Sequence, residues 1–333
     1  MGSALQEEKA GWIVSPAFDL CFIINLWWVL VALLPEATAG TVAQQSSLAF
    51  WQIYFITTPH RWITLLLVAA DPDKRQDRTG LYLMMAVIAA VVVGGAQLTV
   101  GGFSCLLAIE YVWNAWHFGA QHGGILRIYS MKSGGGRRWL ELNTMRLFPP
   151  YVSLRLVAEL NGWLELNPTV GSLIGIVDYV ALAGPLLLVS QVLVRFTQAQ
   201  TPKLLYLLNV YAMYAAMLSC LRFGFHQHLV MLTVANAAFH SVEYFAIITH
   251  YASKRRTQGS QSAFQAMARH WGRTMCLFVL AIGVLSTVME NSRYELAIQI
   301  FLATNLWAAF MHYTYDGLIW KLRKPQTAKT LGV

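Results

Sequence analysis

The chain has 333 residues, of which 56% are hydrophobic and only 12% are charged, and its formal net charge is +8. A soluble domain of this length usually carries about 25% charged residues. The deficit excludes an ordinary soluble protein and predicts one integral membrane domain covering residues 1–333. Because no solvated domain is available to carry a basic face, we expect no nucleic-acid partner. The N-terminus has no basic region leading into a short apolar segment, so we expect no cleaved signal peptide.

Apolar runs long enough to cross a membrane recur along nearly the whole sequence. A helix needs about 20 apolar residues to cross the hydrocarbon core, and the mean hydropathy is +0.48. The sequence therefore predicts an all-α bundle of transmembrane helices. The predicted spans are residues 12–34, 47–70, 80–98, 103–126, 147–166, 171–195, 203–222, 227–252, 274–291 and 296–319. The 147–166 run contains Arg155 and Glu159, and if it lay along the membrane interface instead the protein would have nine spans.

Clusters of lysine and arginine predict the orientation. Four clusters directly follow the spans 47–70, 103–126, 227–252 and 296–319. Basic loops stay on the cytoplasmic side, and all four can do so only if 147–166 also crosses. We therefore expect ten crossings, with both termini cytoplasmic, in an inner or plasma membrane.

Four histidines share a depth in this topology. The spans 47–70, 103–126, 227–252 and 296–319 would all run from outside to inside, and each carries a histidine near or just past its middle. These histidines are His60, His117, His240 and His312. Histidines that only pack in separate places have no reason to share a depth, whereas histidines that converge on one centre must.

Polar residues form a stripe on the 103–126 span. At about 100° per residue, Glu110, Asn114, His117 and Gln121 fall within about 60° of one another. Such a stripe must face protein or a cavity rather than lipid. His122, five residues after His117, is rotated from it by about 140° and lies off the stripe.

The spans 227–252 and 296–319 repeat this pattern. Asn236, His240, Glu243 and His250 lie within about 80° on the first of these helices. On the second, Asn305, His312 and Asp316 align. Ionisable groups inside a membrane are costly, so residues of this kind are candidates for a functional site.

The 47–70 span contains a proline directly before its histidine. Pro59 lacks a backbone donor and predicts a kink at His60. Arg61 follows, and because a bare arginine in mid-membrane costs several kcal/mol, we expect it to face protein or water.

Imidazoles combined with carboxylates suit iron, copper or zinc, and open positions beside such ligands suit iron that activates oxygen. The expected metal ligands are His60, His117 and His240, completed by Glu243, His250 or His122. A ligating histidine needs its second nitrogen held by a carboxylate, amide or carbonyl. The residues expected to hold the ligands are Glu110, Asn114, Gln121, Asn236, Asn305, His312 and Asp316.

Three short motifs, "TTPHRW", "AWHFGAQ" and "FHSVEYF", resemble the Brp/Blh family of membrane β-carotene dioxygenases. The resemblance implies that His60, His117 and His240 bind iron and that a carotenoid is cleaved. Two departures stand out. The last histidine of the family pattern falls on Tyr244, and no acidic residue follows the Pro-His motif closely. Glu243 and Tyr244 are therefore the catalytic candidates.

The predicted function is a membrane-embedded non-haem iron oxygenase. Its partners would be membrane lipid, a hydrophobic substrate (carotenoid, isoprenoid or fatty acyl) and a possible redox protein. A fatty-acid desaturase or hydroxylase is a rival class, since "HFGAQH" satisfies a His-x4-His box. However, no adjacent His-His pair occurs to complete a diiron set.

Two other classes remain open. A b-haem electron-transfer protein is possible because His226 and His240 are fourteen residues apart, but no other two histidines within a single span share that spacing. A proton- or ion-coupled transporter is possible because of Asp19, Glu110, Asp178 and Glu243, although no internal repeat supports it.

Overall fold

The computed structural model describes residues 11–32, 49–75, 78–163, 167–255, 262–323 and 325–332. Every regular element in these ranges is a helix, which confirms the all-α prediction. The chain divides into two compact units. The first is drawn from Met1–Thr41 and Asn114–Glu243, and the second from Val42–Trp113 and Tyr244–Gly332. Some predicted span ends, at 33–34, 47–48 and 164–166, lie outside the described residues.

Among the described residues, seven helices are long and apolar enough to cross a membrane, which supports an integral membrane protein. They are Ala49–Ala70, Thr79–Val100, Thr169–Val194, Gln198–Phe223, His228–Arg255, Trp271–Glu290 and Glu295–Ile319. These correspond to seven of the ten predicted spans. The other three, 12–34, 103–126 and 147–166, are not among them.

The 12–34 segment is not the continuous helix that its hydropathy predicts. It consists of α2 (Pro16–Phe18), the π-helix η1 (Asp19–Ile23) and α3 (Trp28–Ala32). The Asp19 carboxylate accepts three backbone N–H groups from the preceding turn, which anchors the start of the segment. Asn25 has a φ of 55°, a left-handed conformation that breaks the helix. Hydropathy alone does not report either of these local interactions.

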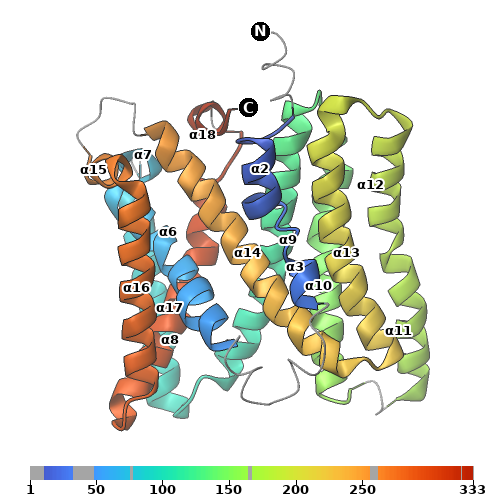
Figure 1. Ribbon diagram of the computed structural model, residues 1–333. Helices are drawn as coiled ribbons and strands as arrows, with labels where there is room; N and C mark the ends of the chain where they lie inside the picture. Colours follow the sequence, from blue (N-terminus) through green and yellow to red (C-terminus); the bar gives the residue numbers. More distant parts are fainter. Residues whose placement is uncertain are drawn as a thin grey trace. The chain divides into compact units, whose positions relative to one another are not determined.

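The first unit is a helical bundle. Its helices are α10 (Arg138–Leu160), α11 (Pro168–Ala181), α12 (Ala183–Val194) and α13 (Thr201–Phe223), the last preceded by the short η3 (Gln198–Gln200). Two long helices, α9 (Ser104–Lys132) and α14 (His226–Arg255), contribute their residues from Asn114 onward and up to Glu243. Within this unit α10, green in Figure 1, packs against both α12 (yellow-green) and α13 (yellow).

A glycine allows α9 and α10 to pack closely in this bundle. A Cβ atom placed on Gly119 of α9 would lie 2.3 Å from the carbonyl oxygen of Met145 on α10. One helix turn later, a Cβ on Gly123 would lie 3.3 Å from the Leu142 side chain. Small residues at this spacing let two helix backbones pack tightly, and they hold the turn of α9 that carries His117.

The charges that made 147–166 doubtful as a span have partners in the first unit. Arg155 is buried, donates to Glu159 at 2.7 Å and lies 3.6 Å from Asp178. Asp178 in turn accepts a hydrogen bond from the Tyr151 hydroxyl at 2.5 Å. These contacts satisfy the charged groups of α10 inside the protein, so they do not require α10 to lie at the membrane surface.

The second unit is built around α17 (Glu295–Ile319). This helix packs against α6 (Thr58–Ala70) and α8 (Thr79–Val100), and α16 (Trp271–Glu290) packs against α6, α17 and η2 (Ile53–Thr57). The shorter helices of the unit are α7 (Pro72–Arg75), α15 (Ala263–Arg269) and α18 (Pro325–Leu331). The first turns of α9 and the last turns of α14 complete it.

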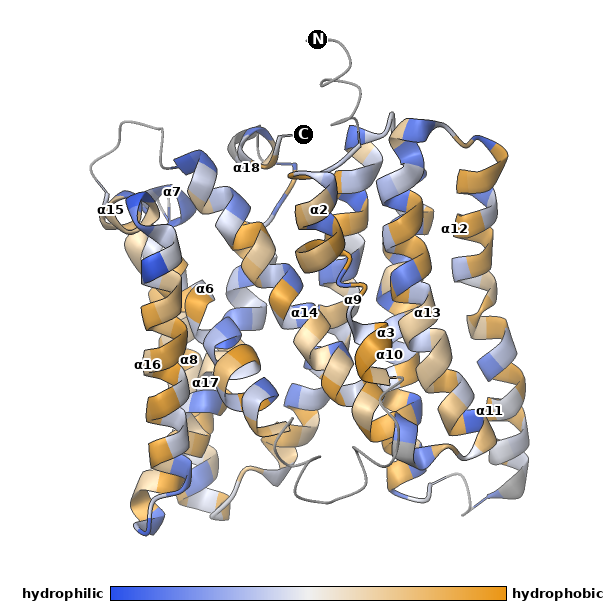
Figure 2. Ribbon diagram, in the orientation of Figure 1, coloured by the Kyte–Doolittle hydropathy of each residue, from blue (hydrophilic) through white to orange (hydrophobic). Residues whose placement is uncertain are grey.

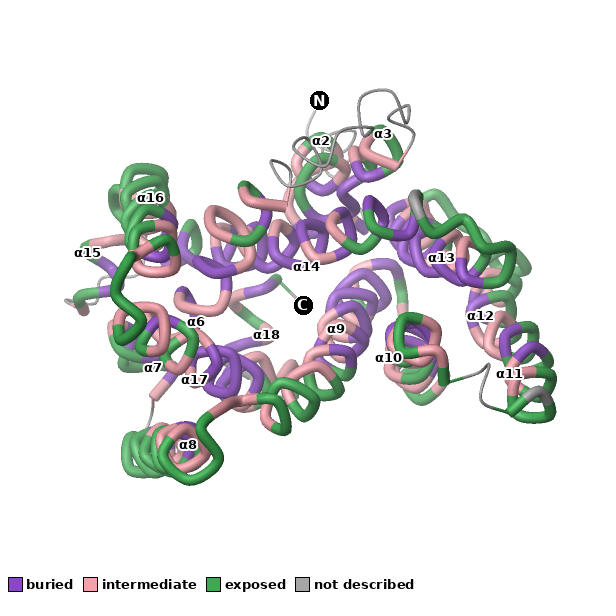
Figure 3. The backbone as a smooth tube through the Cα atoms, turned by 90° about the horizontal axis from the view of Figure 1, so that it is seen from below, coloured by how far each residue is buried: buried purple, intermediate pink, exposed green. Residues whose placement is uncertain are grey.

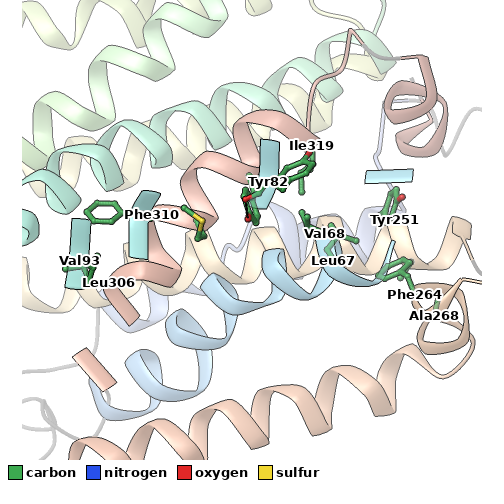
Figure 4. Packing of buried hydrophobic residues seen from close by; sticks show 14 residues of the cluster. Leu67, Val68, Tyr82, Val93, Tyr251, Phe264, Ala268, Leu306, Phe310 and Ile319 are labelled. Carbon is green, nitrogen blue, oxygen red and sulfur yellow. Dashed lines mark hydrogen bonds between the residues drawn. The ribbon is translucent and has the colours of Figure 1, made fainter. Parts of the chain in front are cut away.

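An apolar core holds the second unit together. Leu67 and Val68 of α6 and Tyr251 of α14 belong to one buried cluster with Leu306 and Phe310 of α17 (Figure 4). In contrast, α8 and α16 keep many exposed residues (Figure 3), and most of these are hydrophobic (Figure 2). Apolar side chains of this kind on an outer surface suit contact with lipid.

The predicted kink at Pro59 takes the form of a π-helical turn. The segment η2 (Ile53–Thr57) directly precedes α6, and the Thr58 N–H donates to the carbonyl of Ile53 rather than to that of the residue four before it. Widening the helix by one residue relieves the clash and the lost donor that a proline brings. The π-helical turn therefore sets the face of α6 on which the His60 side chain lies.

Candidate metal centre

Four buried histidines from four helices form a group that could hold a metal ion. They are His60 on α6, His117 on α9, His240 on α14 and His312 on α17. Each offers a ring nitrogen, and these nitrogens all lie within 4.8 Å of one another. Imidazole nitrogens bind zinc at about 2.0–2.1 Å, so neighbouring ligands of one ion lie about 3–4 Å apart.

The first unit contributes one pair of these histidines. The rings of His117 and His240 have centroids 4.9 Å apart and meet edge to face. The Phe118 ring stacks on the His240 ring, with 3.9 Å between their centroids. Packing of this kind holds the His240 ring in one orientation and shields it from water.

The second unit contributes the other pair. The ring centroids of His60 and His312 are 4.3 Å apart. Tyr244, on the turn of α14 after His240, meets both rings edge to face, at 4.9 Å from His60 and 5.2 Å from His312. Both pairs therefore consist of close, buried imidazoles, and in the second pair a tyrosine ring lies against both members.

Hydrogen bonds reach His312 directly. The Oγ1 atom of Thr64 lies 2.7 Å from His312 Nδ1. Thr64 also donates to Asp316 Oδ1 at 3.2 Å, and the Tyr244 hydroxyl donates to the same oxygen at 2.5 Å. The sequence predicted His312 as a residue that holds a ligand, yet the structure places it among the four candidate ligands. Asp316, which was predicted to support a ligand, lies with Oδ2 3.6 Å from His312 Nε2.

Glu243 is held by a separate network in the first unit. It accepts hydrogen bonds from Gln121 Nε2 at 2.7 Å and from the Tyr206 hydroxyl at 2.5 Å. Gln121 also donates to the backbone carbonyl of His240 at 2.9 Å. Glu243 does not belong to the group of four, and Gln121 supports His240 through its backbone rather than through its ring.

His122 joins this network although it lies off the polar stripe of α9. Its Nδ1 atom is 3.0 Å from the Tyr206 hydroxyl and 3.3 Å from Glu243 Oε2. His122 and His250, which the sequence offered as further ligands, are buried but do not belong to the group of four. His250 lies ten residues after His240, in the part of α14 that belongs to the second unit.

Glu110 pairs with an arginine. Its Oε1 atom accepts from Arg61 at 2.9 Å and from the Tyr313 hydroxyl at 2.6 Å. Arg61 therefore contacts protein, as predicted, and Glu110 serves this ion pair where the sequence predicted a histidine partner. Of the asparagines on the polar stripes, Asn114 is half-buried and Asn236 is buried.

Sequence reasoning missed two residues of these networks. Thr64 lies four residues after His60 and so on the same face of α6; that spacing could have been noticed. Tyr206 belongs to α13, which carries no polar stripe, and no sequence signal points to its contact with Glu243. A buried tyrosine needs a partner for its hydroxyl, but the sequence does not say which partner.

The chain matches no protein-family model, no curated protein and no solved structure.

Proposed function

We propose that the protein is a membrane-embedded non-haem iron oxygenase that acts on a lipid-soluble substrate. The observation that carries this proposal is the group of four buried histidines, His60, His117, His240 and His312, with ring nitrogens within 4.8 Å of one another. Histidines buried together without a cation are costly when protonated, whereas neutral imidazoles bind iron well.

The number and type of ligands favour oxygen chemistry. Four neutral imidazoles leave one or two positions of a five- or six-coordinate ion open, and open positions suit iron that activates oxygen. Bound there, iron would supply the site with its reactivity toward O2. The rings of Phe118 and Tyr244, packed against the histidines, keep water away and leave an apolar surface for a substrate.

A second feature supports a lipid-soluble substrate. An open cavity of about 430 Å³ on the second unit is lined almost entirely by apolar atoms, from Thr249 of α14 and from Trp271, Met275 and their neighbours on α16. Trp271 and Met275 also pack against the small buried cluster that contains Tyr244. A hydrocarbon chain in this cavity would therefore lie one layer of side chains away from a residue that contacts His60.

The resemblance of the three histidine motifs to carotenoid dioxygenases favours cleavage of a carbon–carbon double bond. In that reaction both atoms of O2 enter the substrate and two carbonyl products form. It needs no external electron donor.

We further propose that the protein crosses the membrane ten times, with both termini cytoplasmic. The seven apolar helices would be joined by α9, α10 and the interrupted segment that contains α2 and α3. The four basic clusters support this arrangement. Reporter fusions at residues 40 and 168 should read outside, and fusions at 76 and 260 inside. Opposite sides for 76 and 260 would contradict it.

The metal content of detergent-purified protein tests the function. We expect iron without haem absorbance, and loss of that iron in His117→Ala. The control is His270→Ala, because His270 is exposed between α15 and α16. The iron-loaded protein should then incorporate label from 18O2 into a long-chain polyene presented in detergent.

Two results would replace the proposal with another function. Haem absorbance would indicate an electron-transfer protein. Absence of every transition metal, after reconstitution with ferrous iron under anaerobic conditions, would contradict a metal enzyme.

A further inference from the structure

The hydroxyl group of Thr64 lies at the centre of a buried network that determines how His312 can bind a metal. Thr64 Oγ1 is 2.7 Å from His312 Nδ1, 2.5 Å from the Tyr244 hydroxyl and 3.2 Å from Asp316 Oδ1. Thr64, Tyr244 and His312 are at most 3% exposed. Water therefore contributes little to this arrangement, and the residues themselves must satisfy each other's donors and acceptors.

A count of the protons assigns the donors. Trp320 Nε1 can only donate, and it donates to the Tyr244 hydroxyl at 3.2 Å. The Tyr244 hydroxyl gives its single proton to Asp316 Oδ1, at 2.5 Å. The Thr64 hydroxyl has a single proton and three neighbours that could accept it: the Tyr244 oxygen, Asp316 Oδ1 and His312 Nδ1. Because Tyr244 gives its own proton to Asp316, the 2.5 Å contact between Thr64 Oγ1 and the Tyr244 oxygen requires the Thr64 proton, which then points toward Tyr244 and Asp316 and away from the ring.

Since the Thr64 proton points away from the ring, a lone pair of Thr64 Oγ1 faces His312 Nδ1. That nitrogen must then carry a hydrogen. In a neutral imidazole with hydrogen on Nδ1, the lone pair is on Nε2. Nε2 is thus the atom that His312 can offer to a cation.

The carboxylate of Asp316 adds a second effect. Its Oδ2 atom lies 3.6 Å from His312 Nε2, one helix turn further along α17. At this separation it is too far for a hydrogen bond, but the negative charge of the ionised carboxylate favours a cation bound at Nε2. One carboxylate therefore receives the Tyr244 proton through one oxygen and faces the ligand atom with the other.

We propose that Thr64 is a positioning residue that fixes His312 in the form with hydrogen on Nδ1, so that Nε2 binds the metal. This inference rests on the proposed metal site and specifies which atom of His312 serves it. Groups that orient a ligating histidine typically change metal affinity 10–100-fold when they are removed. Thr64 performs this role through Nδ1, while Tyr244 and Trp320 direct the Thr64 proton away from the ring.

The first test needs no metal. In 15N-histidine-labelled, metal-free protein, the nitrogen chemical shifts distinguish a ring with hydrogen on Nδ1 from one with hydrogen on Nε2. The His312 signals are assigned by their loss in His312→Gln. We expect hydrogen on Nδ1 in the wild type and in Thr64→Ser, and a mixture of the two forms in Thr64→Val. A wild-type ring with hydrogen on Nε2 would overturn the inference.

The second test measures affinity for Co²⁺, whose visible absorption reports binding. We expect Thr64→Val to bind Co²⁺ 10–100-fold more weakly and Thr64→Ser to remain close to wild type. The control is Thr287→Val, which removes another threonine hydroxyl of the same unit, one that donates to the backbone carbonyl of Gly283 at 2.8 Å. It should leave Co²⁺ affinity unchanged.

The outcomes separate the two proposals. If wild-type protein binds Co²⁺ and Thr64→Val binds it equally well, the role of Thr64 is wrong and the metal site stands. If the wild type binds no Co²⁺, the metal site itself is wrong. If Thr64→Val does not fold, Tyr244→Phe provides the alternative variant, since it frees the Thr64 proton to turn toward His312 and should also populate the form with hydrogen on Nε2.

Discussion

The two units each hold a pair of buried histidines, but they support these pairs differently. In the second unit a threonine contacts His312 itself and an aspartate faces the same ring. In the first unit the carboxylate, Glu243, is bonded to Gln121 and Tyr206, and the support for His240 reaches its backbone carbonyl. His312 of the second unit is therefore contacted at its ring nitrogens, whereas the shown support for His240 of the first unit is ring stacking and a hydrogen bond to its backbone.

Because of this difference, we expect variants of one network to change mainly metal binding and variants of the other to change mainly the stability of the fold. Changes to the network around Thr64 and Asp316 should alter the metal site at modest cost to folding. Changes to the network around Glu243 should alter folding more than the metal site.

The largest effect should come from removing one imidazole from either pair. We expect His117→Ala and His312→Ala to lose bound iron to the same extent, because one ion that needs both pairs cannot be retained by one of them. The measurement is iron per protein after gel filtration. If His117→Ala loses half of the iron and His312→Ala loses the other half, each pair binds its own ion.

Breaking the ion pair of the second unit should have the next largest effect. Arg61→Leu leaves the mostly buried Glu110 carboxylate without its cation, and removal of one partner of a buried pair costs about 3–5 kcal/mol. We expect a clear fall in the thermal unfolding midpoint in detergent. Arg269→Leu, at an exposed position of the same unit, is the control and should change little. Equal midpoints for both variants would show that the Arg61–Glu110 pair does not stabilise the protein.

A pair of tyrosine variants compares the two networks directly. Tyr206→Phe removes one donor from buried Glu243 and should cost about 1–3 kcal/mol while iron affinity stays near wild type. Tyr244→Phe should weaken metal binding, because it frees the Thr64 proton. Thermal unfolding and metal titration of both variants provide the comparison. If Tyr206→Phe weakened metal binding as much as Tyr244→Phe, the proposed contrast between the units would be wrong.

The close packing of α9 against α10 predicts a smaller loss of folding stability when its glycine is replaced. A methyl group on Gly119 would meet the Met145 carbonyl oxygen at 2.3 Å, so Gly119→Ala should destabilise the first unit by about 1–3 kcal/mol. Gly124, on the same helix, has open space where its Cβ would lie, and Gly124→Ala is the matched control. Unfolding midpoints should differ between the two variants. If the Gly119→Ala midpoint equalled that of Gly124→Ala, a Cβ at Gly119 would have to lie further than 2.3 Å from the Met145 carbonyl oxygen.

The smallest effect concerns pH. Burial acts to raise the pKa of Glu141, but hydrogen bonds from Lys203, Arg127 and Ser130 outweigh it and hold that pKa below its ordinary value of 4.5. A carboxyl with a lowered folded-state pKa contributes stability above its unfolded pKa, and this contribution is lost as the pH falls through the folded one. We expect Glu141→Gln to reduce the unfolding midpoint at pH 7 and to have less effect near pH 3. If Glu141→Gln lowered the unfolding midpoint equally at both pH values, packing rather than the charge of Glu141 would explain the effect.

The sequence predicted the helices better than it predicted their contacts. Hydropathy located seven helices of membrane length. The depth shared by four histidines indicated a common centre, but only His60, His117 and His240 were predicted as ligands, and His312 was expected to hold one of them. The first segment was wrong because Asp19 and Asn25 interrupt it through local hydrogen bonding and backbone conformation, which hydropathy does not measure. Glu110 was assigned to a histidine because one helix face does not show that Arg61 lies opposite it. Tyr206 could not be found at all, because its role depends on which helix packs beside α9.

The most direct test of the central claim is the ratio of metal to protein, measured together with X-ray absorption at the iron edge. One shared site predicts one iron per chain, with about four imidazole nitrogens at about 2.0–2.2 Å, judged from zinc–imidazole distances. Two irons per chain, each with two imidazoles, would mean that the pairs act separately. No bound iron after anaerobic reconstitution would contradict the claim.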